Sequence, residues 1–448
     1  MSRPQSEAEY LARLVPPSVA GSIIGRRTMF KGALAAGAAL SLPPLLAACS
    51  GGSSSGTTSG GKATGTVSLG SNYSDAIPKA AMQAVSDAYH AKNSAVTVKT
   101  NTIDHNTFQD NINNYLQGKP DDVFTWFAGY RMRFFAAQGL VGDISDVWSK
   151  FDGFSDAFKT ASTGDDGKQY FVPIYNYPWA MFYRPSVFSK YGYTAPKTLD
   201  ELTTLGKQME KDGLIPVAFA DKDGWPAMGT FDILNMRING YQFHIDLMAH
   251  KQSWSDPKVK KVFDTWAGLL PLHQPASLGR TWQEAAQSLQ QKKAGMYLLG
   301  SFVSQQVDQG KDLDFFTFPE VDSTIGSDAL DAPIDGFMMA KKPTNEAAAK
   351  DFLAYLGTPE AEYTYGKTDT SDVLANSKAD TSFYNDVQKK SAELIGSAKH
   401  IAQFMDRDTN ADFASTVMIP SIQEFLKNPD DIDGVTSSIQ EQAASIFG

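Results

Sequence analysis

The residues best suited to chemistry in this chain are aromatic side chains that stand close to amides or carboxylates. An aromatic ring offers a flat apolar surface, and an amide or carboxylate offers hydrogen-bond groups of fixed direction. Together they could bind a ligand with apolar faces and a rim of hydroxyl groups, as a pyranose ring has. Neighbouring residues of these two kinds occur at Asn72 and Tyr73, at Asn176 and Tyr177, and at Asp223 and Trp225.

Motifs for catalysis or metal binding are missing from the sequence. There is no Gly-x-Ser-x-Gly elbow and no glycine-rich phosphate loop. The six histidines are scattered, and the nearest pair, His244 and His250, would face different sides of a helix. We therefore expect no enzymatic activity, no metal and no cofactor.

The beginning of the chain predicts its compartment. Arg26 and Arg27 precede an uncharged stretch, 32–48, which ends in Leu-Ala-Ala before Cys49. This order is typical of an export signal, and the stretch is shorter than the roughly 20 apolar residues of a membrane span. It resembles the signal of a twin-arginine-exported bacterial lipoprotein, in which the cysteine is lipidated. We predict an export signal at 1–48 and lipidation of Cys49, on the outer face of the cytoplasmic membrane.

The segment 49–65 is predicted to be a flexible tether, because it consists almost entirely of Gly, Ser and Thr after Cys49. Cys49 is the only cysteine, so the mature chain has no internal disulfide. The formal net charge is −10 for the whole chain and becomes −13 without residues 1–48. An acidic protein repels phosphate backbones, which argues against a nucleic-acid partner.

Strand and helix patterns alternate along the rest of the chain. A capping box at 198–201 and the cap at 255–257 mark two helix starts. Strands are expected at 67–69, 95–99, 122–127, 215–220 and 295–299, and helices at 77–89, 108–116, 131–138, 199–209, 257–270, 282–291 and 345–356. This order predicts an α/β protein with mainly parallel sheets flanked by helices, and its restart near 198 predicts two lobes.

Five segments, in order, resemble the carbohydrate-binding branch of the extracellular solute-binding proteins, the family that includes maltose-binding protein. They are 121–126 (DDVFTW), 182–188 (FYRPSVF), 196–202 (PKTLDEL), 294–302 (AGMYLLGSF) and 335–353, which runs from Asp-Gly-Phe to Lys-Asp-Phe-Leu. Each motif alone is weak, but together they cover nearly the whole mature chain.

The resemblance implies a type II periplasmic-binding-protein-like fold, whose two lobes close on a ligand about a hinge. It places lobe 1 at 66–175 and 330–365, and lobe 2 at 176–329 and 366–448. It implies a carbohydrate ligand and, as partners, the permease subunits of an ABC importer with their ATPase. We expect a monomer held at the membrane by the lipid on Cys49.

The resemblance also assigns roles to Trp126 of lobe 1 and to three candidates of lobe 2. Trp126 matches an aromatic that stacks on sugar in the family, although a core tryptophan is the alternative. Asp223 and Trp225 match an acidic–aromatic pair that contacts ligand, and a simple turn is the alternative for Asp223. Phe302 stands where the family usually has tryptophan. A further acidic and basic cluster, 406–408, is interpreted as ion pairs, and a place in the cleft is the alternative.

The remaining candidates are placed by their position in the predicted fold. Asn176 and Tyr177 lie where the family's first crossover passes the cleft, and a hinge strand without ligand contact is the alternative. Asn72 and Tyr73 follow the first strand, and Asp335 precedes a glycine at the start of a returning strand. Two other functions stay open: a binding protein for a glycerophosphodiester or polyamine, and a secreted glycan-active enzyme.

Overall fold

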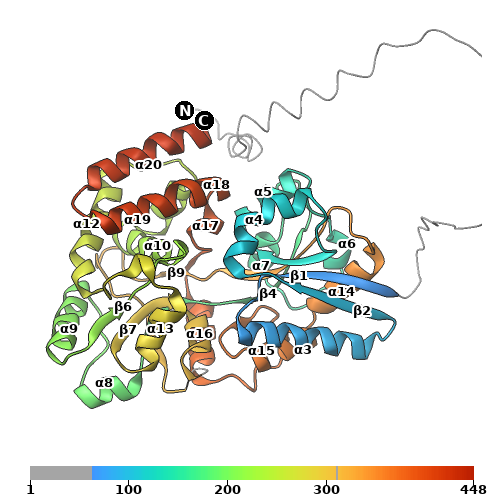
Figure 1. Ribbon diagram of the computed structural model, residues 1–448, viewed down its shortest axis with the longest axis horizontal. Helices are drawn as coiled ribbons and strands as arrows, with labels where there is room; N and C mark the ends of the chain where they lie inside the picture. Colours follow the sequence, from blue (N-terminus) through green and yellow to red (C-terminus); the bar gives the residue numbers. More distant parts are fainter. Residues whose placement is uncertain (1–62, 309–310) are drawn as a thin grey trace, which may run out of the picture.

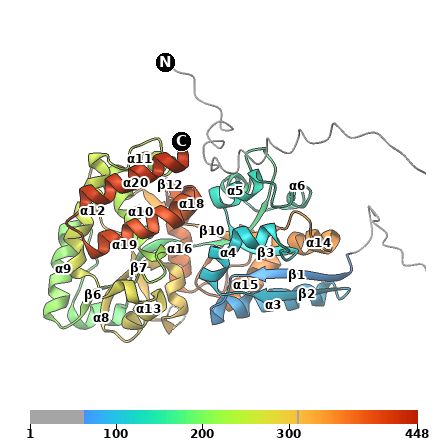
Figure 2. The same cartoon turned by 45° about the horizontal axis from the view of Figure 1, so that its top comes forward.

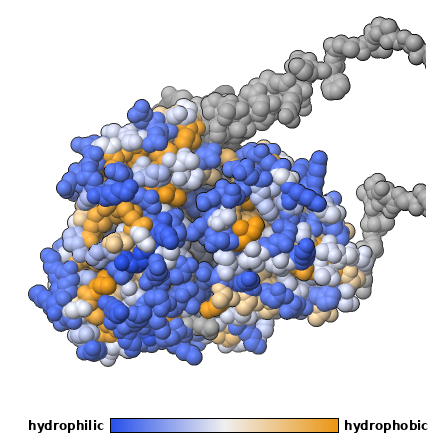
Figure 3. Space-filling model, in the orientation of Figure 1, coloured by the Kyte–Doolittle hydropathy of each residue, from blue (hydrophilic) through white to orange (hydrophobic). Residues whose placement is uncertain are grey.

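The computed structural model describes residues 63–308 and 311–448. The predicted export signal, Cys49 and nearly all of the predicted tether lie outside the described residues. The described chain forms two lobes that lie side by side, and β4 and β10 lie in the region where the lobes meet (Figures 1 and 2). The face in view is largely hydrophilic, with apolar residues gathered mainly over α12 and α20 (Figure 3).

Lobe 1 is built on a sheet with the strand order β11-β4-β10-β3-β1-β2. Its strands are β1 (Gly65–Ser71), β2 (Val96–Thr102), β3 (Val123–Phe127), β4 (Phe171–Asn176), β10 (Ile334–Met339) and β11 (Val373–Leu374). Its helices are α3 (Ala76–Lys92), α4 (His105–Gln117), α5 (Tyr130–Ala137), α6 (Ser145–Trp148), α7 (Asp156–Ala161), α14 (Glu346–Leu356) and α15 (Pro359–Thr368).

Lobe 2 is built on a sheet with the order β6-β7-β5-β8. Its strands are β5 (Trp179–Tyr183), β6 (Ile215–Ala218), β7 (Ala294–Gly300) and β8 (Asp314–Phe316). Its helices are α8 (Pro185–Tyr191), α9 (Leu199–Lys211), α10 (Trp225–Asn239), α11 (Tyr241–Met248), α12 (Pro257–Leu269), α13 (Trp282–Gln290), α19 (Ile419–Lys427) and α20 (Ile432–Phe447), with short turns η1 (Leu270–Leu272), η2 (Ser277–Gly279) and η3 (Ser301–Gln305).

The segments that link the lobes form a small parallel sheet of β9 (Ala329–Asp331) and β12 (His400–Ala402). The helix α16 (Asp386–Ser397) precedes β12. Three short helical segments follow it: α17 (Met405–Asp408), α18 (Ala411–Phe413) and the π-helix η5 (Ala414–Met418). Of these, α17 packs against α5 of lobe 1 and against α10 of lobe 2, so it lies where the lobes meet.

The two-lobed α/β fold is confirmed, but the expectation of mainly parallel sheets is wrong. In lobe 1, β1 is parallel to β2 and β3, whereas β10 is antiparallel to both of its neighbours and β11 is antiparallel to β4. In lobe 2, only the β6–β7 pair is parallel. The physical reason is that β10 and β11 begin at the cleft edge, where β1, β3 and β4 end, so they run in the opposite direction.

Lobe 1 also extends further along the chain than its predicted end at 365. β11 pairs with the end of β4 through Val373 and Asn176. Beyond it, the amide of Asn376 donates to the carbonyls of Asp152 and Gly357, both in lobe 1. The return to lobe 2 therefore comes after residue 376.

The predicted helix starts are present where the sequence places them. The Thr198 hydroxyl accepts a hydrogen bond from the Glu201 amide at the start of α9. Asp256 accepts from the Lys258 amide at the start of α12, with Pro257 at the first helical position. Such caps satisfy amides that have no partner inside the helix.

Candidate functional site

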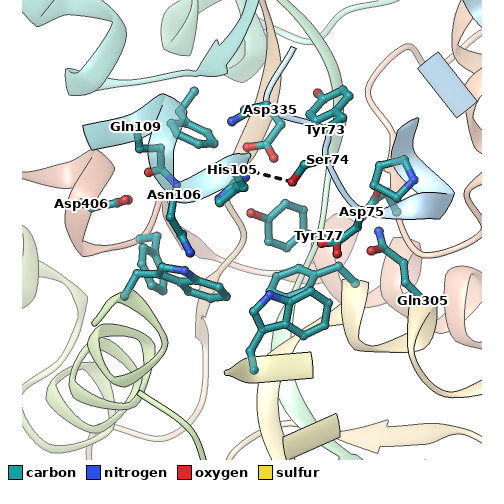
Figure 4. A pocket seen from close by; sticks show the side chains of 18 of the residues that line it. Tyr73, Ser74, Asp75, His105, Asn106, Gln109, Tyr177, Gln305, Asp335 and Asp406 are labelled. Atoms are coloured by element: carbon teal, nitrogen blue, oxygen red, sulfur yellow. Dashed lines mark hydrogen bonds between the residues drawn. The ribbon is translucent and has the colours of Figure 1, made fainter. Parts of the chain in front are cut away.

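A cavity of about 160 Å³ lies between the lobes and is lined by side chains from both. At roughly 10–15 Å³ for each water, it could hold on the order of ten water molecules. A hexose, with six carbons and six oxygens, displaces a comparable volume. Figure 4 shows the labelled side chains converging on this space from several segments of the chain.

Lobe 1 lines the cavity with the cleft edge of its sheet. Three strands end there, and the residues at or just beyond their ends are Asn72 and Tyr73 after β1, Phe127 at the end of β3, and Tyr175 and Tyr177 around the end of β4. Two strands begin at the same edge, which brings Asp335 of β10 and Asp372 before β11 beside them. Polar groups from distant parts of the sequence thus meet because five strand ends share one edge.

Two helices of lobe 1 also open on the cavity. α3 begins after Ser74 and Asp75, and α4 begins after Asp104 with His105, Asn106 and Gln109 facing the cleft. The His105 amide donates to the Ser74 hydroxyl at 3.1 Å, which ties the two helix starts together (Figure 4). Burial lowers the pKa of His105 to about 4, so its ring is neutral near pH 7.

Lobe 2 contributes aromatic rings, which come from the starts of four elements and from the segment before α17. They are Trp179 of β5, Trp225 of α10, Trp282 of α13, Phe302 of η3 and Phe404. Trp179 stacks on Phe404 at 4.9 Å between ring centroids, and Phe302 makes edge contacts with Trp179, Trp225 and Trp282. The rings form one continuous aromatic wall opposite the polar edge of lobe 1.

Arg407 of α17 is the one arginine or lysine among the cavity-lining residues of the described chain. Its guanidinium pairs with Asp335 at 2.6 Å, donates to the Tyr177 hydroxyl at 3.0 Å and covers the ring of Phe127. Burial raises the pKa of Asp335, and the charge of Arg407 opposes that rise. Arg407 thus holds ends of β3, β4 and β10 together at the cleft.

Several buried polar atoms of the cavity-lining residues have no hydrogen-bond partner. Among them are Nδ2 of Asn72, the hydroxyl oxygen of Tyr73 and the indole nitrogens of Trp179 and Trp225. Buried donors without a partner are costly and uncommon in folded proteins. Their presence at one cavity indicates a site for a ligand with hydrogen-bond acceptors.

Six of the nine predicted ligand-binding residues line this cavity: Asn72, Tyr73, Tyr177, Trp225, Phe302 and Asp335. Asn176 is not in the lining, and its backbone lies between β10 and β11 in the sheet. Asp223 is half-buried outside the lining, before the start of α10. Which of the lining residues touch a ligand stays a prediction.

Trp126 lies away from the cleft, contrary to its predicted position. It is 1% exposed and packs against Phe108 of α4 and Phe135 of α5. Successive residues of a strand point to opposite faces, so Trp126 faces these helices while Phe127 lines the cavity. The alternative reading of Trp126 as a core residue is the one that matches its place in the fold.

The sequence interpretation missed several lining residues, among them Asp75, Trp179, Gln283 and Asp372. Two features of the sequence could have identified Trp179 and Gln283. Trp179 follows Tyr177 by two residues across the first crossover, and Gln283 lies in the first turn of a predicted helix. Asp406 and Arg407 form ion pairs, as interpreted, and they also line the cavity, which is the alternative given for the cluster 406–408.

Residues 63–308 and 311–448 contain no group of three or more His, Cys, Asp or Glu side chains arranged to hold a metal ion. In the same residues, no helix is long and apolar enough to cross a membrane.

The fold and the cavity between its lobes define a two-lobed binding protein. The model of the bacterial extracellular solute-binding protein family matches residues 73–363, and the chain belongs to that family. An uncharacterized ABC transporter extracellular-binding protein of Pyrococcus horikoshii is 26% identical over 63% of this chain and 65% of its own length. The chain thus aligns with slightly less than two thirds of that relative.

Two solved structures illustrate the likeness. The bacterial solute receptor AcbH, described as having an exclusive preference for β-D-galactopyranose, is 50% identical, with a TM-score of 0.83 over 86% of this chain and 99% of AcbH. A chitin oligosaccharide binding protein is 20% identical, with a TM-score of 0.78 over 86% of this chain and 99% of that one. The second likeness concerns the fold alone.

Proposed function

We propose that this protein is the substrate-binding component of an ABC importer and captures a carbohydrate outside the cytoplasmic membrane. The observation that carries the proposal is the cavity, in which the aromatic wall of lobe 2 faces the polar edge of lobe 1. The C–H faces of a pyranose would lie on the wall, and its hydroxyls would meet the amides and carboxylates of the edge. The unpartnered donors of Asn72, Trp179 and Trp225 would gain acceptors.

The ligand we propose is a monosaccharide of galacto configuration. The cavity volume suits one sugar ring, and the receptor described as preferring β-D-galactopyranose is 50% identical to this chain. In galactose the axial C4 hydroxyl leaves one ring face more apolar than the other. A site with tryptophans on one lobe and mostly polar groups on the other suits such a ring.

The test is a thermal-shift screen of residues 50–448 against neutral hexoses and pentoses, followed by calorimetry. A ligand at 100 times its dissociation constant raises the free energy of unfolding by about 2.7 kcal/mol, which a melting curve resolves. We expect galactose to give the largest shift. Shifts from polyamines or glycerophosphodiesters, with none from any sugar, would exclude carbohydrate capture while leaving the importer role.

We further propose that the mature chain begins at Cys49, is lipid-anchored and acts as a monomer at the membrane surface. The supporting observations are the twin arginine, the uncharged stretch and the Leu-Ala-Ala-Cys sequence. Cys49→Ala should move the protein from the membrane fraction to the soluble extracytoplasmic fraction. Replacing both Arg26 and Arg27 with lysine should stop export by the twin-arginine route; continued export would point to the general route.

A further inference from the structure

The charge balance of the cavity restricts which carbohydrates could enter it. Five aspartates line it, at positions 75, 104, 335, 372 and 406, against one arginine among the described residues. Arg407 pairs with Asp335 at 2.6 Å and lies 3.6 Å from Asp406. Behind it, Arg131 pairs with Asp406 at 2.9 Å. Both guanidinium groups are therefore already committed to carboxylates of the protein.

Three of the lining carboxylates have no cation beside them. Among the described residues, no Lys, Arg or His nitrogen lies within salt-bridge distance of Asp75, Asp104 or Asp372. Asp75 accepts a hydrogen bond from the Gln283 amide across the cleft, at 3.3 Å. Asp372 is 2% exposed, and burial raises the pKa of its carboxyl well above the usual range, which favours the uncharged form. An anionic group placed beside Asp75 and Asp104 would meet repulsion that no nearby cation offsets.

The helix N-termini at the cavity are the other places where an anion could bind, and side chains already hydrogen-bond to the starts of three of them. Asp75 precedes the first residue of α3 without capping it, and Asp104 accepts hydrogen bonds from Thr107 at the start of α4. In lobe 2, Asp221 accepts from the Ala227 amide in the first turn of α10. Glu284 accepts from the Thr281 amide at the start of α13.

We propose that this cleft selects its carbohydrate by charge: it admits a neutral sugar and rejects sugars that carry a carboxylate, sulfate or phosphate. The determinants are the carboxylates of Asp75 and Asp104, at the starts of α3 and α4. This inference rests on the proposed capture of a carbohydrate. It adds a specificity that shape alone would not impose, since a uronate and its amide have nearly the same size and outline.

The experiment compares galactose, galacturonate and galacturonamide on the mature chain by calorimetry at pH 7, with the glucose series in parallel. The amide keeps the shape of the carboxylate without its charge. We expect galacturonamide to bind within about tenfold of galactose, and galacturonate to bind at least 100-fold more weakly than the amide. Equal affinity for the two would overturn charge selection and leave carbohydrate capture intact.

Asp75→Asn supplies the residue-level test, with Asp87→Asn as the matched control. Asp87→Asn removes the same charge from the same helix, but Asp87 is exposed and lies away from the cavity. We expect Asp75→Asn to reduce the amide-to-carboxylate ratio at least fivefold and Asp87→Asn to leave it unchanged. An unchanged ratio in both variants would remove Asp75 from the determinants. If no sugar of either series binds, carbohydrate capture fails, and charge selection fails with it.

Discussion

The guanidinium of Arg407 and the carboxylate of Asp335 lie 2.6 Å apart, although one residue belongs to a short helix near the end of the chain and the other begins β10. Both side chains are less than a tenth exposed. The pair joins α17, which also packs against lobe 2, to the sheet of lobe 1. The ion pair therefore connects the two lobes and also forms part of the cleft surface.

Arg407→Met should destabilise the protein and abolish ligand binding, because it leaves Asp335 buried without a partner charge. Breaking a buried ion pair costs about 3–5 kcal/mol. The measurement is urea denaturation with calorimetry on the same samples. The double variant Arg407→Met with Asp335→Asn should recover part of the lost stability. If it is no more stable than the single variant, the buried carboxylate is not the source of the loss.

Trp225→Ala and Trp126→Ala should have different effects: the first should weaken sugar binding, and the second should lower the stability of the fold. Trp225 is partly exposed and lines the cavity, so its removal should weaken sugar binding at least tenfold with a small change in melting temperature. Trp126 is 1% exposed in the core, where truncation costs about 3–5 kcal/mol. Melting curves and calorimetry separate the two effects. A stable Trp126→Ala protein that has lost sugar binding would restore Trp126 to the site.

Gly229→Ala should weaken binding through Trp179. A Cβ on Gly229 of α10 would overlap the six-membered ring of Trp179, which lines the cavity. The rigid indole would have to move into the space proposed for the ligand. We expect at least a tenfold loss of affinity while the protein stays folded. Gly268→Ala is the control, because the corresponding Cβ meets no atom within 4 Å.

The stability of the protein should fall between about pH 4 and pH 7 because of Asp408. Burial raises the pKa of this carboxyl from 3.8 to about 7, so the folded protein keeps a proton that the unfolded chain releases. The unfolded state binds fewer protons in this window, and the free energy of unfolding therefore decreases as pH rises. The contribution is full below pH 4 and is of order 4 kcal/mol smaller above pH 7.

Asp408→Asn removes this titration but keeps a side-chain oxygen. That oxygen can accept the hydrogen bond that the Gln403 amide donates to Asp408 at 2.7 Å. Urea titrations at several pH values should show the variant gaining stability over the parent as pH rises from 4 to 7. Parallel pH profiles for the two proteins would mean that Asp408 is ionised in the folded state.

The sequence predicted the two lobes and the helix caps, because these depend on local patterns, and the family resemblance helped to select six of the residues that line the cavity. The phase of β3 could not be predicted. All five residues of Val123–Phe127 are buried, so no alternation of polar and apolar residues shows whether Trp126 or Phe127 faces the cleft. The direction of the strands could not be predicted either, because β10 lies between β3 and β4 but comes from a distant part of the chain.

The long-range partners of Arg407 could not be predicted from the sequence either. Its neighbours Asp406 and Asp408 make local ion pairs the simplest interpretation. Its main partners, Asp335 and Tyr177, come from other strands, and only the assembled sheet brings them to it. Local charge patterns predict that such a residue forms ion pairs, but they do not identify its partners.

The position of β10 also affects how the protein is made. This strand fills the middle of the lobe 1 sheet, yet its register joins Asp335 to Phe127, roughly 200 residues earlier in the chain. During synthesis, β3 and β4 emerge long before the strand that must lie between them. The first-made part of the molecule therefore cannot reach its final form until β10, Ile334–Met339, has been translated. Lobe 1 is accordingly not a unit that a single cut in the chain could release intact.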